Sequence, residues 1–318
     1  MGDLQGMDDG AITPQLPPLK RRGSQVEAPS SSEEGVRGGA VPQTTSQAIR
    51  EATTHLAATS DTARLDAEVL MAHALGVTCS DLLLRHMADA APANFATLVE
   101  RRLAHEPVAY IVGAQEFYGL PFRVTADVLI PRGDSEVLVE RALVAHLDVG
   151  RVLDCGTGSG ALLLAVLAHL RQAEGVGIDR SPAALVVATE NAAALGLDRR
   201  ARMQLADWTK SGWDQAFGLF DLVLANPPYV ESDANLTPSV RAFEPAGALF
   251  AGADGLDDYR LLIPQLPRLL APNGVALVEI GATQADSVGA IARGAGFDVS
   301  VHRDLGDRPR VVELTRRS

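Results

Sequence analysis

Cysteine is scarce in this sequence. Only Cys79 and Cys155 occur among 318 residues, and neither belongs to a CxxC pair or to another spacing typical of zinc ligands. We therefore expect no disulfide framework and no metal site, and a reducing cytoplasm is the expected compartment. No apolar run approaches the length needed to cross a bilayer, and the N-terminus lacks the pattern of a signal peptide. No membrane association is expected.

Basic residues are outnumbered as well. The chain holds 28 Lys and Arg against 40 Asp and Glu, for a net charge of −12 at pH 7. Such a chain has no general electrostatic attraction for phosphate backbones, which argues against a nucleic-acid substrate. With 47% hydrophobic residues, the sequence can instead build one large α/β domain and a smaller second domain.

The first 45 residues lack large apolar side chains. They are rich in Gly, Pro, Ser and Gln, and such a composition cannot bury enough surface to offset the loss of chain entropy. Residues 1–45 are therefore predicted to be a disordered tail. The only charge cluster there, Lys20-Arg21-Arg22, is too short to indicate more, so we favour a dispensable tail over a docking arm.

The rest of the chain changes its pattern twice. Residues 46–113 repeat apolar positions at helical spacing, which predicts a small helical domain. Residues 114–135 read as a linker in which segments 117–124 and 128–131 pair as a β-hairpin. From 136 to 318, strands alternate with helices such as 160–172 and 182–195, which predicts a parallel sheet covered on both faces. The expected strands are 151–155, 175–179, 202–205, 220–225, 275–280, 299–302 and 311–314.

A glycine loop, residues 156–160, directly follows the first of these strands. Glycines allow the backbone to turn tightly and let a ligand approach closely, so the loop predicts a cofactor site. A dinucleotide-binding fingerprint would need a third glycine where Ala161 or Leu163 stands. Asp154 also places a carboxylate close to where the pyrophosphate of a dinucleotide would lie. Both features favour a positively charged cofactor without phosphates.

Two later strand ends carry further acidic residues. Asp179 lies about twenty positions past the loop, where doubly wound folds hold ribose hydroxyls, although it also suits the start of the helix near Ser181. Asp207 and Trp208 offer an acceptor and an apolar plate for an adenine, while Trp208 would suit a core equally well.

The stretch Asn226-Pro227-Pro228-Tyr229 follows the fourth strand. That strand is expected beside the first, where the strand order reverses and ligands bind. Prolines cannot donate hydrogen bonds, so the carbonyl of Pro227 is free to join the Asn226 side-chain oxygen in accepting both hydrogens of an NH₂ group. Tyr229 offers a flat face beside them. The four residues predict a site for a planar amide or an exocyclic amine.

Together, Asp154, the glycine loop and the Asn226–Tyr229 stretch resemble the class I S-adenosylmethionine-dependent methyltransferases that act on planar nitrogen. Further stretches resemble one group among them, the release factor glutamine methyltransferases (HemK/PrmC family), from about residue 46 to the end. These are 106–113 (EPVAYIVG), 116–119 (EFYG), 129–136 (LIPRGDSE), 243–245 (FEP) and 303–306 (RDLG). Where the family commonly has Pro and Thr, this chain has Gly133 and Ser135. The glycine loosens the linker, and the serine keeps a hydroxyl.

The resemblance implies a Rossmann-like α/β fold with a seven-stranded sheet and a small N-terminal helical domain. It implies S-adenosyl-L-methionine as cofactor and methyl transfer to the side-chain N5 of the glutamine in the Gly-Gly-Gln motif of class I peptide chain release factors. The helical domain would dock that partner, and we expect a monomer. The expected cofactor-binding residues are Asp154, Gly156, Thr157, Gly158, Ser159, Gly160, Asp179, Asp207, Trp208 and Asn226. The expected substrate-binding residues are Asn226, Pro227, Pro228 and Tyr229, of which Asn226, Pro227 and Tyr229 are the expected catalytic ones.

Three alternatives remain open. A nucleic-acid adenine or guanine amino-group methyltransferase would use the same four residues, because an adenine amine is also planar. A non-catalytic S-adenosylmethionine-binding protein would not need them. A dinucleotide oxidoreductase is opposed by the missing glycine.

Overall fold

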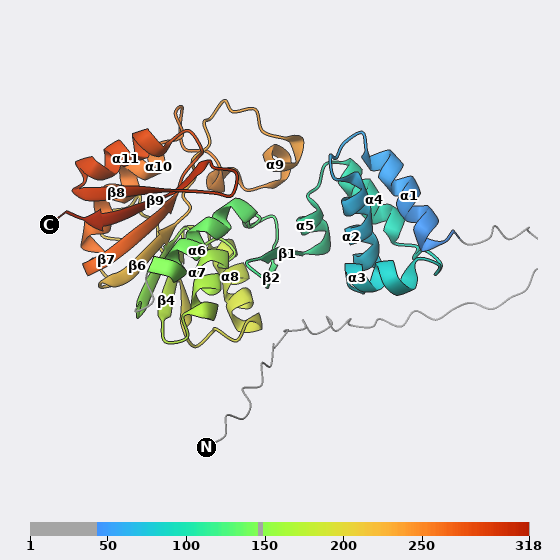
Figure 1. The fold of residues 1–318 in the computed structure, drawn as a ribbon, viewed down its shortest axis with the longest axis horizontal. Coiled ribbons are helices and arrows are strands. Elements are labelled where there is room, and N and C mark those ends of the chain that lie inside the picture. The colour runs from blue at the N-terminus through green and yellow to red at the C-terminus, as the bar shows by residue number, and fades with distance from the viewer. Residues whose placement is uncertain (1–42, 146–148, 318) are drawn as a thin grey trace, which may run out of the picture. The chain divides into compact units, whose positions relative to one another are not determined.

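The structure is a computed structural model that describes residues 43–145 and 149–317 (Figure 1). The predicted tail lies outside the described residues except for its last three. Helix α1 (Thr45–Leu56) begins within those three, because Thr44 and Gln47 form a capping box in which each side chain accepts a hydrogen bond from the other's backbone N–H.

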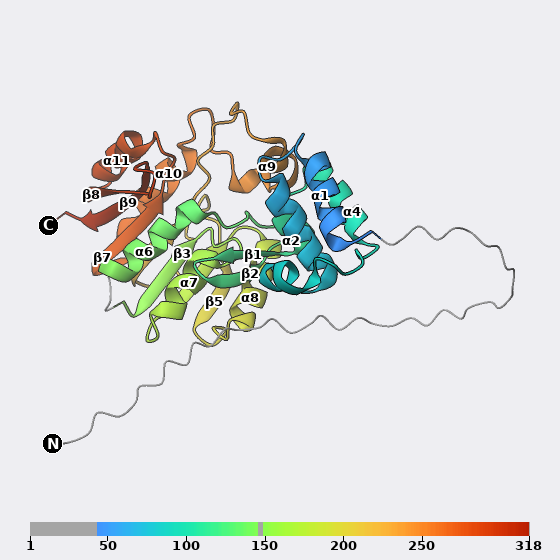
Figure 2. The ribbon, with the colours of Figure 1, turned by 45° about the vertical axis from the view of Figure 1, so that its right-hand side comes forward.

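The N-terminal helices pack around a core of their own (Figures 1 and 2). A buried ion pair joins α2 (Ala63–Leu75) to α4 (Phe95–Leu103), with 2.7 Å between Arg102 Nε and Asp66 Oδ2. The other helices are α3 (Cys79–Asp81), the π-helical turn η1 (Leu82–His86) and α5 (Val108–Val112). Among all described helices, none is by itself long and apolar enough to span a membrane. The helical segments 63–75 and 79–86 reach that length and apolar composition only together, and they are bent by 98° relative to each other.

A β-hairpin follows, but its strands differ from the predicted ones. Strands β1 (Ala114–Phe117) and β2 (Leu120–Arg123) pair across a two-residue turn in which Tyr118 and Gly119 both have positive φ, 51° and 72°. The predicted pairing of 117–124 with 128–131 is wrong. Val128 is instead buried against α8 in irregular backbone, and its carbonyl oxygen accepts a hydrogen bond from the Tyr110 hydroxyl at 2.6 Å. The apolar pattern of that segment reflects burial without strand pairing.

The predicted seven-stranded sheet is confirmed. Its order is β5-β4-β3-β6-β7-β9-β8, parallel except for β9, which runs antiparallel to both of its neighbours. Consecutive parallel strands step outward in one direction from β3 to β5 and in the other from β6 onward, so the order reverses between β3 and β6. The strands are β3 (Arg151–Cys155), β4 (Glu174–Asp179), β5 (Ala201–Leu205), β6 (Phe220–Ala225), β7 (Leu270–Glu279), β8 (Phe297–Arg303) and β9 (Pro309–Arg316).

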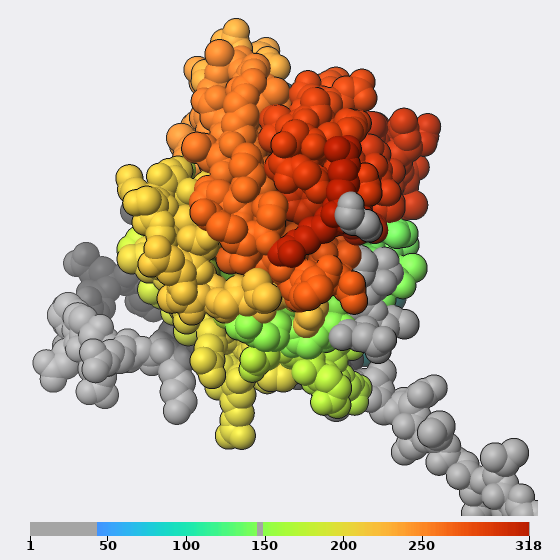
Figure 3. Space-filling model, turned by 90° about the vertical axis from the view of Figure 1, so that its left-hand side faces the viewer, coloured from blue at the N-terminus to red at the C-terminus, as the bar shows by residue number. Residues whose placement is uncertain are grey.

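Helices cover both faces of this sheet because successive strand residues point to opposite sides. Val152 belongs to the core cluster with α6 (Glu136–Ala145) and α7 (Ala161–His169), whereas Leu153 packs on the side of α10 (Asp257–Leu262) and α11 (Ala285–Gly294). The remaining elements are α8 (Pro182–Ala194), α9 (Pro238–Phe243) and the 3₁₀ turns η2 (Gly133–Ser135), η3 (Ala246–Ala248) and η4 (Ile263–Arg268). Figure 3 shows the face where the chain ends, built mainly of segments that follow β5.

Candidate active site

An open cavity lies at the carboxyl ends of β3, β4 and β6. This is the point where the strand order reverses, which is the usual place for ligands in such sheets. Eight of the predicted residues line it: Gly156, Thr157, Gly158, Ser159, Asp179, Trp208, Asn226 and Pro228. The lining also includes residues 245, 247 and 248 of the segment after β6, and residues 127–132 of the linker, which the sequence did not indicate as site residues.

The glycine loop forms the floor of the cavity in a conformation that glycine adopts readily. Gly156, Gly158 and Gly160 have φ values of 77°, 54° and 83°, in the left-handed region. The backbone N–H of Gly156 donates to the carbonyl of Ile178 at 2.9 Å, which holds the loop against β4. A β-carbon at Gly156 would lie 3.1 Å from the ring of Trp208. The loop is therefore shaped by both backbone conformation and close packing.

Asp154 lies beneath this loop and is completely buried. Its Oδ2 accepts a hydrogen bond from the Thr157 hydroxyl at 2.7 Å, while Oδ1 has no hydrogen-bond partner among the described residues. Burial raises the pKa of this carboxyl to about 7, against the opposing effect of the Thr157 hydrogen bond. A buried carboxylate oxygen without a donor fits a cofactor that brings a positive charge or an ammonium group.

The Asn226–Tyr229 stretch forms one wall. Asn226 is half-buried and lines the cavity, and its Nδ2 donates to the hydroxyl oxygen of Ser135 at 3.4 Å. Pro227 and Pro228 are buried, so the turn is rigid. Tyr229 is not in the cavity lining, and its backbone carbonyl accepts from the side chain of Gln284 at 3.1 Å. Burial, and then the charge of Glu279, raise the pKa of Tyr229 to about 12. The Tyr229 side chain packs against the core cluster on the side of α10 and α11.

Comparisons with known proteins agree with this geometry. The PrmC N-terminal domain matches residues 47–113, and a methyltransferase domain matches residues 147–293. A release factor glutamine methyltransferase of Cereibacter sphaeroides is 43% identical over an alignment of 273 residues that covers 83% of this chain and 96% of that protein. One of Moorella thermoacetica is 43% identical over 283 residues, 85% of this chain and 98% of that protein. This chain belongs to the release factor glutamine methyltransferase family.

In this methyltransferase, Asp179 holds the glycine loop as well as the start of α8. Its Oδ2 accepts from the backbone N–H of Gly158 at 3.0 Å, and its Oδ1 accepts from that of Ser181 at 2.9 Å. Each carboxylate oxygen can accept a second hydrogen bond, so the side chain can still receive ribose hydroxyls.

Trp208 and Asp207 differ in their relation to the cavity of the methyltransferase. Trp208 is 9% exposed, lines the cavity, and donates from Nε1 to Asp258 at 3.0 Å. Asp207 does not line the cavity, and its Oδ1 accepts from both the backbone N–H and the hydroxyl of Thr209. Asp258, which orients the indole ring, had no sequence signal, because it lies fifty residues away on α10.

The methyltransferase site contains other residues that the sequence did not single out. Arg132 lines the cavity and forms an ion pair with the buried Glu244. Ser135 also lines it, and Glu279 is buried at the end of β7. Arg132, Ser135 and Glu244 do fall within stretches 129–136 and 243–245, whose resemblance to the family was their only signal. Glu279 had none beyond its place at the end of a predicted strand.

Proposed function

We propose that this protein transfers a methyl group from S-adenosyl-L-methionine to the side-chain N5 of the glutamine in the Gly-Gly-Gln motif of class I peptide chain release factors. The observation that carries the proposal is that the glycine loop and Asn226 line one cavity. A cofactor on the loop and a planar amide at Asn226 would therefore meet there. Family membership supports the choice of glutamine as acceptor.

The cofactor side of the cavity fits S-adenosylmethionine. In the proposal, Asp154 supports the ammonium end of the cofactor from beneath the glycine loop, outside the lining. Asp179 accepts from the ribose hydroxyls, and Trp208 packs against the adenine. Gly156, Thr157, Gly158, Ser159 and Gly160 form the backbone cradle, and Asp207 supports it from outside the lining. The bound cofactor supplies an electrophilic methyl group on a sulfonium.

The substrate side has to activate a weak nucleophile. An amide nitrogen shares its lone pair with the carbonyl, so it attacks slowly unless positive charge on it is stabilised. We assign that role to the side-chain oxygen of Asn226 and the carbonyl of Pro227, which would accept the two amide hydrogens and orient the nitrogen. Pro228 keeps the turn rigid, and Tyr229 packs against the neighbouring core.

The proposal extends to the organisation of the chain. Residues 46–113 would dock the release factor, 114–135 would link them to the methyltransferase domain 136–318, and 1–45 would be a tail. We infer a monomer in the cytoplasm, the compartment that the scarcity of cysteine indicates. The nucleic-acid alternative is disfavoured by the net charge of −12.

The decisive experiment incubates the purified protein with S-adenosylmethionine and a class I release factor and locates the methyl group by peptide mass spectrometry. We expect methylation of the Gly-Gly-Gln glutamine, lost in Asn226→Ala while the Kd for S-adenosylmethionine stays within about twofold. Asn273→Ala, an exposed asparagine at the opposite end of β7, is the matched control and should retain activity. Methylation of DNA or RNA in place of the release factor would overturn the proposal.

A further inference from the structure

We propose that Ser135 and Glu279 are positioning residues that hold the side chain of Asn226 with its oxygen toward the cavity. This inference rests on the proposed function, because it matters only if that oxygen accepts a hydrogen from the substrate amide. The inference gives Ser135 and Glu279 a role in that function and explains why both residues are buried.

The orientation of an asparagine side chain decides what it can bind. One end of the amide accepts hydrogen bonds and the other end donates two. A substrate amide presents an NH₂ group, so Asn226 must offer its oxygen. If the amide were turned by half a rotation, two NH₂ groups would face each other and the substrate nitrogen would be repelled. Some neighbour must therefore hold the NH₂ end of Asn226.

Ser135 is that neighbour. Its hydroxyl oxygen accepts from Asn226 Nδ2 at 3.4 Å, and the residue is only 4% exposed. A distance of 3.4 Å is long for a hydrogen bond. The hydroxyl has a single proton, which it can donate onward while it accepts from Asn226. Asn226 therefore depends on what receives that proton.

Glu279 is the carboxyl group placed to receive it. This residue ends β7, the strand next to β6, which Asn226 follows, and it is 1% exposed. Burial raises its pKa to about 7, while the nearby Ser135 and Asn226 side chains lower it. Its Oε2 has no hydrogen-bond partner among the described residues. An ionised carboxylate attracts the NH₂ end of an amide and repels the oxygen end, so it favours the orientation that the proposed reaction needs.

The other charged or titratable groups around Glu279 come from four elements. Arg310 of β9 lowers its pKa, and Asp134 of η2 raises it. Tyr229, after β6, and Tyr259 of α10 lie close enough for Glu279 to raise their own pKa values, and the Tyr259 hydroxyl donates to the backbone carbonyl of Glu279 at 2.9 Å. Both phenols stay neutral near pH 7. Glu279 is thus the group of this cluster that ionises in that range.

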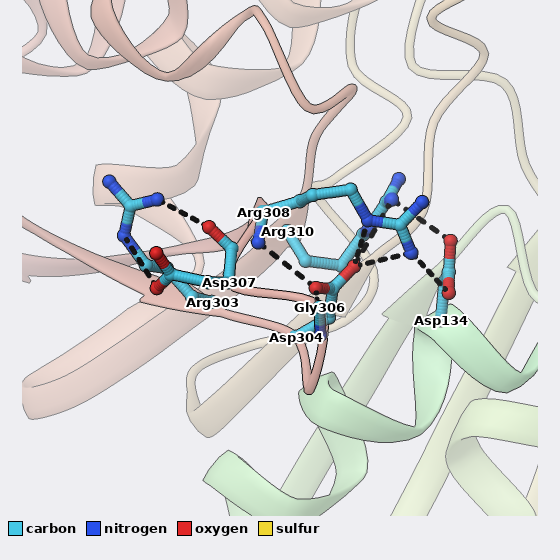
Figure 4. A network of polar contacts seen from close by, with 7 residues as sticks. All are labelled: Asp134, Arg303, Asp304, Gly306, Asp307, Arg308 and Arg310. Carbon is cyan, nitrogen blue, oxygen red and sulfur yellow. Dashed lines mark hydrogen bonds and ion pairs between the residues drawn. The ribbon is translucent and has the colours of Figure 1, made fainter.

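A polar network holds the backbone next to Ser135 (Figure 4). Asp134 pairs with Arg310 at 2.9 Å and with Arg308 at 3.3 Å, and both arginines also reach Asp304, at 3.4 and 2.8 Å. Arg310 is 6% exposed. The β8–β9 hairpin therefore anchors η2, and with it the hydroxyl that faces Asn226.

Kinetics of release factor methylation test the role of the hydroxyl. Ser135→Ala should lower kcat about 10-fold, with KM and the Kd for S-adenosylmethionine changed less than about twofold, because one orienting hydrogen bond is lost. Ser135→Thr keeps the hydroxyl and should recover most of the loss. A wild-type kcat in Ser135→Ala, or equal rises in KM and Kd with no change in kcat, would overturn the role.

A second measurement is independent of the substrate. The side-chain amide signals of Asn226, assigned by their loss in Asn226→Ala, are followed by NMR against pH in the protein without added S-adenosylmethionine. We expect a titration with a midpoint near pH 7 that disappears in Glu279→Gln and persists in Asp154→Asn, the other buried carboxyl with a pKa of about 7. If the Asn226 signals do not titrate in the wild type, or titrate in the same way in Glu279→Gln, the inference is wrong. If the wild type methylates no release factor, the proposed function fails, but this titration still decides whether Glu279 and Asn226 are coupled.

Discussion

The indole ring of Trp208 lies directly against Gly156, so that a β-carbon at position 156 would come within 3.1 Å of ring atom Cη2. The ring is held in turn by Asp258, which accepts its Nε1–H. The floor of the cavity and the residue assigned to the adenine are therefore a single packed unit. A change in the loop must either move the ring or distort the backbone.

Gly156→Ala should weaken binding of S-adenosylmethionine more than about 10-fold, because it adds a clash with Trp208 to the cost of roughly 1–2 kcal/mol for a left-handed alanine. Gly196→Ala is the matched control, since Gly196 also has a positive φ, 68°, but has open space around it. Calorimetric titration with S-adenosylmethionine and thermal unfolding separate the two effects. Equal losses of affinity in both variants would contradict a specific role for the contact.

Asp154→Asn should abolish a proton release that accompanies cofactor binding. Burial raises the pKa of Asp154 to about 7, so near that pH about half of the molecules carry the proton. A bound ammonium group would lower this pKa and expel the proton. Calorimetry at pH 7 in two buffers of different ionisation enthalpy measures the release, which we expect in the wild type only.

The same pKa shift predicts how stability depends on pH. Because the folded-state pKa lies above the ordinary value of 3.8, the ionised carboxylate destabilises the cofactor-free fold, and stability falls as pH rises from about 4 to 7. Asp154→Asn should therefore unfold at a higher temperature than the wild type at pH 8 but not at pH 4. A constant difference across that range would argue against a buried, protonated Asp154.

Asp304→Asn should have the opposite pH dependence. A hydrogen bond from the backbone N–H of Arg308 is the main cause that lowers the pKa of Asp304 to about 2. A hydrogen bond from the Arg308 side chain and its positive charge lower this pKa further. A lowered pKa contributes stability above about pH 4 that is lost as pH falls toward 2. The variant should melt a few degrees below the wild type at neutral pH, with the difference closing in acid. Asp307→Asn, on the same loop but with a side chain 90% exposed, is the control and should change little.

Local patterns predicted the sheet well, for reasons visible in its strands. Residues of β3 and β6 are almost all buried, so these strands read as mainly apolar runs, although β3 contains Arg151 and Asp154 and β6 contains Asp221. The hairpin was predicted less well. Tyr118 occupies a left-handed position that tyrosine rarely adopts, so the turn at 118–119 was hidden within an apolar stretch. Val128 and Ile130 then looked like a strand because they are buried, although they pair with none.

The sequence by itself determined the parts of the site whose residues are neighbours along the chain: the glycine loop after β3 and the Asn226–Tyr229 turn after β6. Their chemistry depends on local backbone geometry, which short spacing patterns encode. Only the tertiary structure brought Ser135, Asn226, Glu279 and Arg310 into one cluster. They lie on η2, directly after β6, on β7 and on β9, and they meet only when the sheet is assembled. A buried carboxylate or hydroxyl gains its role from the groups that surround it, and those groups are far apart in the sequence.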